Sequence, residues 1–270
     1  MQLVKFIKTH GLGNDFVIIP NFTKILDLST KQIAVICKRR TGIGCDQLIL
    51  LEHSQIADCK MIIFNADGSK AEACGNAARC VALIQMNEQV VNDITIEINA
   101  NTFKASRNGH NIILNMGKAD FAWQKIPLAK SLTELPANYF LPLPVPIAVN
   151  VGNPHAIFFV NDLNLFDLNK LGPKIEHDSL FPNRINVTLA QIINQNTISI
   201  EVWERGVGIT SACGTAACAT AAAAYQLKFI QSHVSILFKD GYLTINLLKD
   251  NTIEMIGEAH ITFAGEYCLY

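Results

Sequence analysis

One six-residue phrase occurs twice in this chain and constrains its fold more than any other feature. The phrase Ala-Cys-Gly-Asn-Ala-Ala at residues 73–78 is matched by Ala-Cys-Gly-Thr-Ala-Ala at residues 212–217, 139 positions later. Each copy follows a turn-rich stretch and precedes a long run of small and apolar residues, which predicts a buried helix. Long-range self-similarity of this kind indicates an internal duplication. We therefore expect two domains of one topology, with Cys74 and Cys213 at matching positions.

Polar residues outside the two predicted helices support the duplication. The offset of 139 residues pairs three of them with polar residues of the second half: Asn14 with Asn153, Gln47 with Asn186, and Asn65 with Glu204. A chance likeness between two alanine-rich helices would not extend to positions in the turns and strands around them. Unrelated topologies in the two halves would refute the duplication.

Proline placement predicts how the chain is divided. Five of the nine prolines lie between Pro127 and Pro146, in an aperiodic stretch between the two copies. We predict an N-terminal repeat domain at 1–118, a proline-rich linker region at 119–146 and a C-terminal repeat domain at 147–258, with residues 259–270 joining the first domain. Helices are expected at 27–40, 74–87, 163–171 and 213–227, among many short strands. This mixture predicts α+β domains.

Charge and composition exclude several classes of partner. A net charge of −1 gives no general attraction to nucleic acid or to an anionic membrane, so neither is an expected partner. No apolar run reaches the roughly 20 residues that span a bilayer. The first residues lack a signal-type apolar core, which predicts a cytoplasmic protein. The eight cysteines and seven histidines lack the short spacings of metal knuckles, so no metal is expected.

A cysteine at the start of a helix has a specific chemistry. The first N–H groups of a helix have no partner within it, and that end carries partial positive charge. A thiol there has a pKa of roughly 3.5–7.5 instead of about 8.5, so we expect Cys74 and Cys213 to ionise easily. The same N–H groups can bind a carboxylate.

Two such cysteines facing each other across a cleft would suit the inversion of a stereocentre. The α-carbon of a bound amino acid would lie between the two sulfurs. One thiolate would remove the α-proton, and the opposite thiol would return a proton on the other face. Arg205 is suited to bidentate binding of a second carboxylate.

Eight motifs in this chain resemble those of the diaminopimelate epimerase family. They lie at residues 10–16, 42–47, 64–69, 74–76, 152–155, 181–186, 204–210 and 212–215, and include His-Gly-Leu-Gly-Asn-Asp-Phe, Cys-Gly-Asn, Gly-Asn-Pro-His and Ala-Cys-Gly-Thr. Each motif alone is only suggestive. They follow the family's order over essentially the whole chain, and together they are highly specific.

This resemblance implies a cofactor-independent isomerase, without pyridoxal phosphate, that interconverts LL- and meso-2,6-diaminopimelate on the way to lysine and cell-wall peptide. It implies two pseudo-symmetric domains, each a strand-rich barrel around a central helix, with the site in the cleft between them, and a homodimer. Cys74 and Cys213 would be the catalytic proton-transfer pair, and His155 and Glu204 would tune their pKa values. Gly75, Asn76, Gly214 and Thr215 would hold the reacting carboxylate, and Asn14, Gln47, Asn65, Asn153, Asn186, Glu204 and Arg205 would bind the rest of the substrate.

The chain departs from the family pattern at two matched positions. Many family members have glycine where this chain has Ala77 and Ala216. Alanine is favoured over glycine by about 1 kcal/mol in a helix interior, so both methyl groups should be tolerated. They nevertheless reduce the room that is expected beside the substrate.

Other interpretations of the same residues remain open. Cys74 and Cys213 could be buried structural thiols, and Arg205 could be an exposed partner in an ion pair. A racemase of proline or hydroxyproline would use the same cysteines but has no second charged group to bind, against which Arg205 argues. Two low-pKa thiols could instead form a disulfide in a redox-sensing protein, and we expect oxidation to link Cys74 to Cys213.

Overall fold

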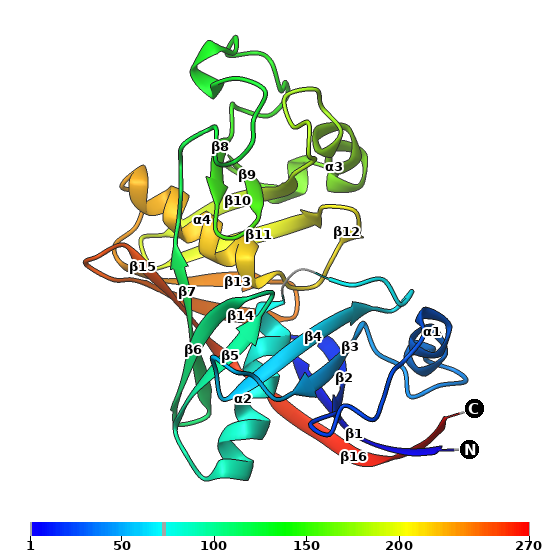
Figure 1. Ribbon diagram of the computed structural model, residues 1–270. Helices are drawn as coiled ribbons and strands as arrows, with labels where there is room; N and C mark the ends of the chain where they lie inside the picture. The colour runs from blue at the N-terminus through cyan, green and yellow to red at the C-terminus, as the bar shows by residue number, and fades with distance from the viewer. Residues whose placement is uncertain (1, 72–73, 270) are drawn as a thin grey trace. The chain divides into compact units, whose positions relative to one another are not determined.

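The same succession of strands and helices occurs twice along the chain (Figure 1). The computed structural model describes residues 2–71 and 74–269, so Ala73 of the repeated phrase lies outside the described residues. The chain divides into unit 1, residues 1–114 with 257–270, and unit 2, residues 115–256. The two divisions fall within the strands β7 (Asn111–Lys118) and β15 (Thr252–Glu258).

The sheet of unit 1 has the strand order β16-β1-β2-β3-β4-β5-β6-β7. Its other strands are β1 (Gln2–Gly11), β2 (Asn14–Pro20), β3 (Gln47–Glu52), β4 (Cys59–Asn65), β5 (Asp93–Ile98), β6 (Asn101–Asn108) and β16 (His260–Leu269). The long antiparallel pairing of β16 with β1 joins the C-terminal segment to the first unit. β6 did not stand out in the sequence because its residues are mostly polar.

The strands of unit 2 follow the order β15-β14-β13-β11-β10-β9-β8, with β12 beside β11. They are β8 (Ile147–Asn150), β9 (Pro154–Phe159), β10 (Asn186–Asn194), β11 (Thr197–Glu204), β12 (Gly208–Ile209), β13 (His233–Phe238) and β14 (Gly241–Leu247) with β15. Each neighbouring pair has the same sense, parallel or antiparallel, as its counterpart in unit 1.

Strand register confirms the internal duplication. In unit 1 the parallel strands β2 and β3 place Phe16 opposite Gln47. In unit 2 the parallel strands β9 and β10 place His155 opposite Asn186. Both residues of the second pair lie 139 positions after those of the first. The two halves therefore share topology and, at the centre of each sheet, register.

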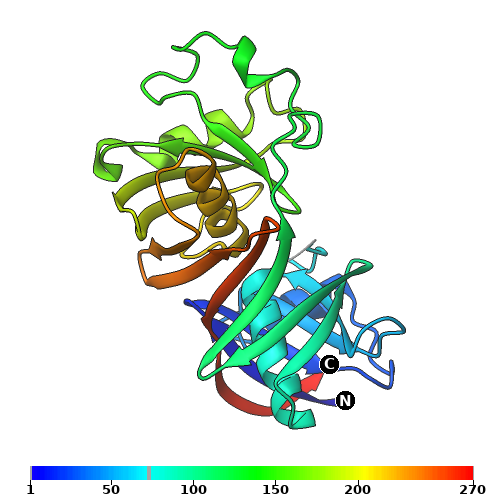
Figure 2. The ribbon, with the colours of Figure 1, turned by 90° about the vertical axis from the view of Figure 1, so that its left-hand side faces the viewer.

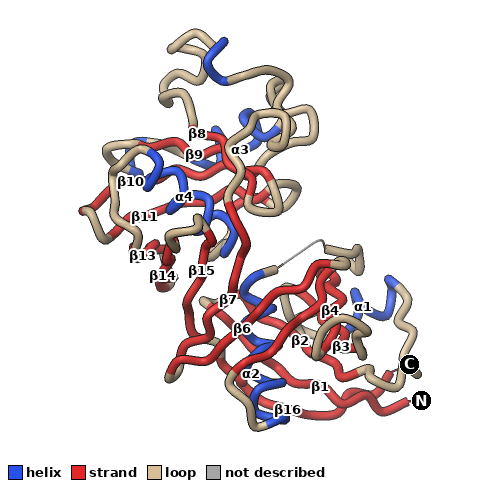
Figure 3. Tube along the Cα trace, turned by 60° about the vertical axis from the view of Figure 1, so that its left-hand side comes forward, coloured by secondary structure: helices blue, strands red, loops and turns tan. Residues whose placement is uncertain are grey.

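One helix runs through each unit. α2 (Gly75–Gln89) contacts strands β1, β2, β5, β6 and β16, and α4 (Gly214–Gln226) contacts β8, β9, β10, β13 and β14. Figure 3 shows α2 along β1 and β16, and Figure 2 shows the gold α4 among the strands of its unit. Nearly all side chains of α4 from Gly214 to Ala224 are buried, because alanine lets strands approach closely. The structure thus has the strand-rich units around central helices that the resemblance implied.

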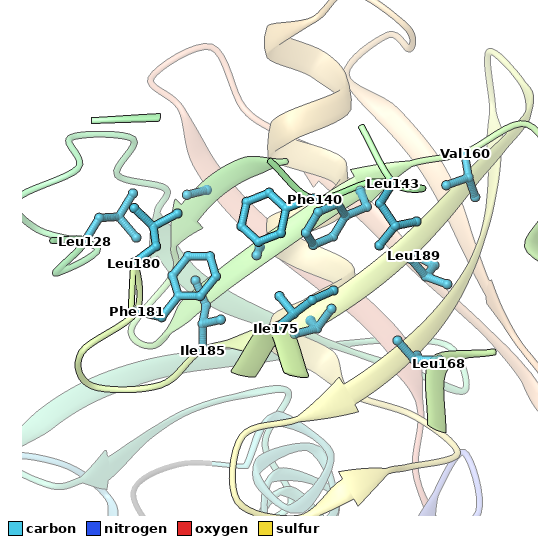
Figure 4. Close-up of a cluster of buried hydrophobic side chains, with 14 of the residues drawn as sticks. Leu128, Phe140, Leu143, Val160, Leu168, Ile175, Leu180, Phe181, Ile185 and Leu189 are labelled. Atoms are coloured by element: carbon cyan, nitrogen blue, oxygen red, sulfur yellow. The ribbon is translucent and has the colours of Figure 1, made fainter. Parts of the chain in front are cut away.

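The proline-rich stretch belongs to the core of unit 2. Residues 119–146 were interpreted as a linker, yet Ile126, Leu128, Phe140 and Leu143 are buried in that core. Figure 4 shows Phe140 and Leu143 among side chains from the strands and from α3 (Leu168–Glu176). Prolines prevented regular elements here, but the apolar residues between them still bury surface.

Two shorter helices lie outside the central pair. α1 (Thr30–Cys37) begins at a capping box in which Ser29 and Gln32 bond each other's backbone. The predicted helix at 163–171 was wrong in position. Asp162 caps a single 3₁₀ turn at Leu163–Leu165, and Asp167 caps α3, so the true helix begins and ends later. A further 3₁₀ turn spans Leu132–Glu134.

None of the helices in the described residues is both long and apolar enough to cross a membrane.

Candidate active site

Both repeated cysteines are the residues immediately before a central helix. Cys74 has φ −149° and ψ 108°, and Cys213 has φ −131° and ψ 111°, so each is extended. The carbonyl oxygen of each accepts the first bond of its helix, at 3.0 Å for Cys74 and 3.1 Å for Cys213. The N–H groups that follow, beginning at Gly75 and Gly214, are the ones that lack acceptors within a helix.

The remaining predicted residues of unit 1 lie at the ends of three neighbouring strands, on the same side of the sheet. Asn14 begins β2 and Gln47 begins the parallel strand β3, while Asn65 ends the antiparallel strand β4, directly opposite Gln47. Together with Cys74 and the start of α2, we call these residues the Cys74 set: Asn14, Gln47, Asn65, Cys74, Gly75 and Asn76.

The Cys213 set lies at the equivalent edge in unit 2. Asn153 precedes β9, Asn186 begins β10, and Glu204 ends β11. The set comprises Asn153, His155, Asn186, Glu204, Arg205, Cys213, Gly214 and Thr215. Every residue predicted for the site therefore lies at the corresponding sheet edge or helix start of its own unit.

Polar contacts within the Cys74 set fix its amide groups. The Sγ atom of Cys74 lies 3.7 Å from Oδ1 of Asn14. Nε2 of Gln47 donates to Oδ1 of Asn65 at 3.1 Å. Within the described part of the chain, Oε1 of Gln47 is buried and has no hydrogen-bond partner. A buried acceptor without a donor is costly, which suits a group that a bound ligand would satisfy.

A network of charged side chains bonds Asn14 and fixes its position. Asn14 donates through Nδ2 to Asp46 at 2.9 Å, and Arg39 bonds both Asp46 and Asp15. Lys8 forms an ion pair with Asp15 at 2.6 Å. Burial alone would raise the pKa of Asp15, but hydrogen bonds from Arg39 and Lys8 hold it well below its ordinary value. Asp15 therefore stays ionised at neutral pH and keeps its bonds to both cations.

The sequence reasoning missed Arg79, which supports Asn76. Arg79 is fully buried in α2 and donates from Nη2 to Oδ1 of Asn76 at 2.8 Å. A side chain at Gly11 would place its Cβ 3.2 Å from the same guanidinium. The signal in the sequence was a single arginine in an otherwise small and apolar helix start. The bond from Arg79 thus fixes the orientation of the Asn76 amide.

Cys213 has more enclosed surroundings than Cys74. Its side chain is buried, whereas that of Cys74 is partly exposed. The Sγ atom of Cys213 lies 3.4 Å from Oγ1 of Thr215 and also contacts the Glu204 carboxylate. Glu204 in turn accepts from Oγ1 of Thr210 at 2.5 Å.

The expectation that Cys213 ionises easily is wrong. Burial, and next the negative charge of Glu204, raise the pKa of Cys213 well above its ordinary value. Burial also raises the pKa of Glu204. Desolvation and a like charge therefore outweigh the helix N-terminus, and Cys213 is a protonated thiol.

His155 is buried and uncharged. Its Nε2 lies 2.9 Å from Oδ1 of Asn153, and among the described residues no partner reaches its buried Nδ1. Burial, with a contribution from the charge of Arg205, lowers the pKa of His155 to about 3. The imidazole is thus neutral at physiological pH and ties down the Asn153 amide.

Asn186 organises the backbone that carries Arg205. Its Nδ2 donates to the carbonyl of Pro154 at 2.8 Å, and its Oδ1 accepts from the Arg205 N–H at 2.9 Å. Nη1 of Arg205 lies 3.4 Å from the carbonyl of Asn183. The amide of Asn186 therefore bonds the backbone on both sides.

Comparison with known proteins identifies relatives over nearly the whole chain. A family model described as diaminopimelate epimerase matches residues 6–122 and 147–262. A diaminopimelate epimerase from Rhizorhabdus wittichii is 43% identical over 97% of this chain and 95% of its own length. One from Pelagibacter ubique is 44% identical over 94% of this chain and 95% of its own length.

The fold also resembles structures of distant sequence. A hydroxyproline epimerase from Agrobacterium vitis, solved with bound trans-4-hydroxy-L-proline, has a TM-score of 0.70 at 11% identity. The match covers 99% of this chain and 91% of that one. At this identity the likeness concerns the fold alone, and it agrees with the two-unit, strand-rich architecture.

Proposed function

The chain belongs to the diaminopimelate epimerase family, and from this premise we propose that it interconverts LL- and meso-2,6-diaminopimelate by proton transfer between Cys74 and Cys213. Family membership makes it an isomerase that acts on a small molecule. Without a cofactor, all of the chemistry would fall to side chains and backbone. The proposal places the reaction in the cytoplasm, in the synthesis of lysine and peptidoglycan precursors, and the active protein as a homodimer.

One observation carries the proposal: the duplication puts a cysteine immediately before the central helix of each unit. We propose that these two matching helix starts would offer N–H groups to one carboxylate. A substrate held in this way would have its α-carbon between two sulfurs. We propose that unit 1 and unit 2 each contribute one of these helix starts to the site.

The reaction itself moves one proton off and one proton on. A thiolate takes the α-proton, and the electron pair of the broken C–H bond spreads into the adjacent carboxylate. The opposite thiol then gives its proton to the other face, and it is left as a thiolate. Hydrogen-bond donors around the carboxylate stabilise the charge that develops there, which is commonly the largest contribution to such catalysis.

Cys213 is suited to be the proton donor of the pair. Its raised pKa keeps the proton on sulfur, and the nearby Glu204 opposes ionisation. When the substrate enters, its ammonium group would offset the charge of Glu204 and lower that barrier. The pair would thus exchange roles between the two reaction directions.

The remaining residues of both sets are proposed as ligands of the substrate. Gly75, Asn76, Gly214 and Thr215 would hold the reacting carboxylate. The buried, unsatisfied Oε1 of Gln47 supports its assignment, because an ammonium group could donate to it. The far end of the substrate would meet Arg205 and Glu204, with Asn14, Asn65, Asn153 and Asn186 around it, and His155 would keep the amide of Asn153 in place.

Proton NMR of LL-diaminopimelate with the reduced protein in D₂O tests this function. We expect deuterium at one α-carbon together with the appearance of the meso isomer. L-Proline, incubated in parallel, should not exchange because it has no second carboxylate for Arg205 to bind. Deuterium exchange into proline but not into diaminopimelate would refute the assigned substrate and would still support proton transfer by two cysteines. Exchange into neither would refute the proposed function.

A further inference from the structure

The duplication replaces a pair of cysteines in unit 1 by a charged pair in unit 2. Cys37 ends α1, and its Sγ lies 3.4 Å from that of Cys45. The residues 139 positions later are Glu176, which ends α3, and Arg184, with 3.9 Å between carboxylate and guanidinium. An apolar contact between helix and loop has thus become a site for a carboxylate.

Glu176 is buried, although its cationic partner is not. The side chain of Glu176 is 3% exposed, while that of Arg184 is 55% exposed. An exposed guanidinium at this distance contributes little to holding a carboxylate. A buried charge requires hydrogen bonds in compensation. Those bonds come from elsewhere: Oε1 accepts from the Gly206 N–H at 2.8 Å, and Oε2 accepts from Nε1 of Trp203 at 2.7 Å.

Both donors flank the residues that the proposed function uses. Trp203 precedes Glu204 at the end of β11, and Gly206 follows Arg205 in the turn to β12. One carboxylate therefore bonds the chain on either side of Glu204 and Arg205.

The turn from 205 to 208 is closed by a backbone hydrogen bond, in which the Val207 N–H donates to the carbonyl of Glu204 at 3.0 Å. Gly206 and Gly208 have φ of +74° and +108°, and neither has a side chain to bond the turn. The equivalent turn in unit 1 is held from within, since Asp67 accepts from both the N–H and the hydroxyl of Ser69. Unit 2 thus replaces internal side-chain bonds by a carboxylate from α3.

The helix that carries Glu176 is itself fixed against the same hairpin. α3 contacts β11 and β12. At Gly172 an added Cβ would lie 2.5 Å from the indole of Trp203, so helix and ring are packed with no space between them. The carboxylate therefore cannot follow the turn if the turn moves. Its two hydrogen bonds keep the turn in one place.

We propose that Glu176 is a positioning residue that holds the Arg205–Gly206 turn and thereby sets the affinity of the site for the acidic group of the substrate distant from the reacting carbon. This inference rests on the proposed function, because Arg205 is the residue assigned to that acidic group. Glu176 touches neither the substrate nor the cysteines. Its loss should therefore weaken binding more than chemistry.

The test is Glu176→Gln, with Cys37→Ser at the matching position of unit 1 as control. An amide has one acceptor oxygen, so at least one of the two N–H groups loses its partner, while side-chain volume is kept. A lost bond to a charged acceptor should raise KM for diaminopimelate about 10-fold, with kcat within about 3-fold of the wild type. Cys37→Ser should leave both constants near their wild-type values.

A double-mutant cycle separates positioning from general support. Because Glu176 acts through Arg205, Glu176→Gln should add almost nothing to the KM of Arg205→Gln. The proposal would be overturned if the KM of the double variant rose by the product of the two single increases. It would also be overturned if Glu176→Gln lowered kcat and the melting temperature and left KM unchanged. Glu176→Leu, which removes both acceptors, should exceed Glu176→Gln in its effect on KM.

A spectroscopic readout keeps this inference separate from the proposed function. The chain has two tryptophans, Trp123 and Trp203, and Trp123→Phe assigns their indole N–H signals in ¹H–¹⁵N spectra. Glu176→Gln should shift the Trp203 signal and speed hydrogen exchange at Gly206, even if the wild type does not epimerise diaminopimelate. An unmoved indole signal would overturn the positioning role, whereas a shifted signal with no wild-type turnover would refute only the assigned substrate.

Discussion

Cys74 and Cys213 occupy the same position of a duplicated unit, yet their surroundings differ. Each precedes the central helix of its unit with nearly the same backbone angles. Cys74 is partly exposed and lies near the neutral amide of Asn14. Cys213 is buried against the acidic Glu204, which occupies the position of Asn65 in unit 1.

This difference separates what a duplication keeps from what it leaves free to vary. Strand register and helix starts are kept, because they depend on backbone hydrogen bonds and on the packing of small residues. The partners of each thiol vary, because one side chain at a strand end can be exchanged without disturbing the sheet. Asn65 against Glu204 and Phe16 against His155 are such exchanges. A symmetric frame thus carries two chemically unequal thiols.

Removal of either cysteine should have the largest effect. Cys74→Ala and Cys213→Ala should each lower kcat for epimerisation by at least about 10²–10⁴-fold, since general acid–base catalysis contributes this much. If the two thiols form one pair, both losses should be similar despite their unequal burial. Steady-state assays in both directions measure this, and Cys218→Ala, a buried cysteine of α4, is the control. Substantial activity in either single variant would contradict the conclusion that the two thiols act as one catalytic pair.

Glu204→Gln should make the two thiols more alike. The negative charge of Glu204 raises the pKa of Cys213, so its removal should lower that pKa. Alkylation by iodoacetamide at a series of pH values, read for each cysteine by mass spectrometry, should move to lower pH at Cys213 and stay unchanged at Cys74. Glu201→Gln, exposed on the same strand, is the matched control. An unmoved Cys213 profile would contradict the role given to Glu204.

A pH effect on stability should arise in unit 2 from His155. Its pKa of about 3 in the folded protein lies below the ordinary 6.5, so protons bind the unfolded chain more strongly. Stability is therefore fully present above about pH 6.5 and is lost as the pH falls toward 3. Between pH 7 and pH 5 the wild type should lose about 2 kcal/mol more unfolding free energy than His155→Phe.

Phenylalanine is the residue that unit 1 has at the position of His155, namely Phe16. Urea unfolding at the two pH values provides the comparison. Equal losses in His155→Phe and the wild type would show that His155 is protonated when folded.

The smallest effects are expected where the two units agree. Ala77 and Ala216 are both fully buried in the first turn of a central helix. Ala77→Gly and Ala216→Gly should each cost about 1 kcal/mol of unfolding free energy, with activity nearly unchanged. Thermal unfolding compares them directly. Unequal losses of unfolding free energy would indicate that the first turns of the two central helices are not structurally equivalent.

The sequence predicted those features of the fold that depend on the course of the backbone. The offset of 139 residues predicted the shared topology and the central helices, and it identified Asn14, Gln47 and Asn65 as polar positions matched in the second half. It could not predict the raised pKa of Cys213, which depends on how tightly Glu204 and its neighbours pack around the thiol. The burial of Phe140 and Leu143 was likewise hidden, because an irregular segment has no periodicity to read. Glu176 resembled any other acidic residue at a helix end.

The central claim is that two unequal thiols act as one pair on opposite faces of the substrate. The most direct test is the early time course in D₂O, starting separately from LL- and from meso-diaminopimelate, with isotopes read in both isomers. Two thiols acting in turn predict product that carries deuterium from its first appearance, while unreacted substrate stays protiated. Product that keeps the original proton, or deuterium that accumulates in the substrate first, would mean that a single base serves both faces and would contradict the account.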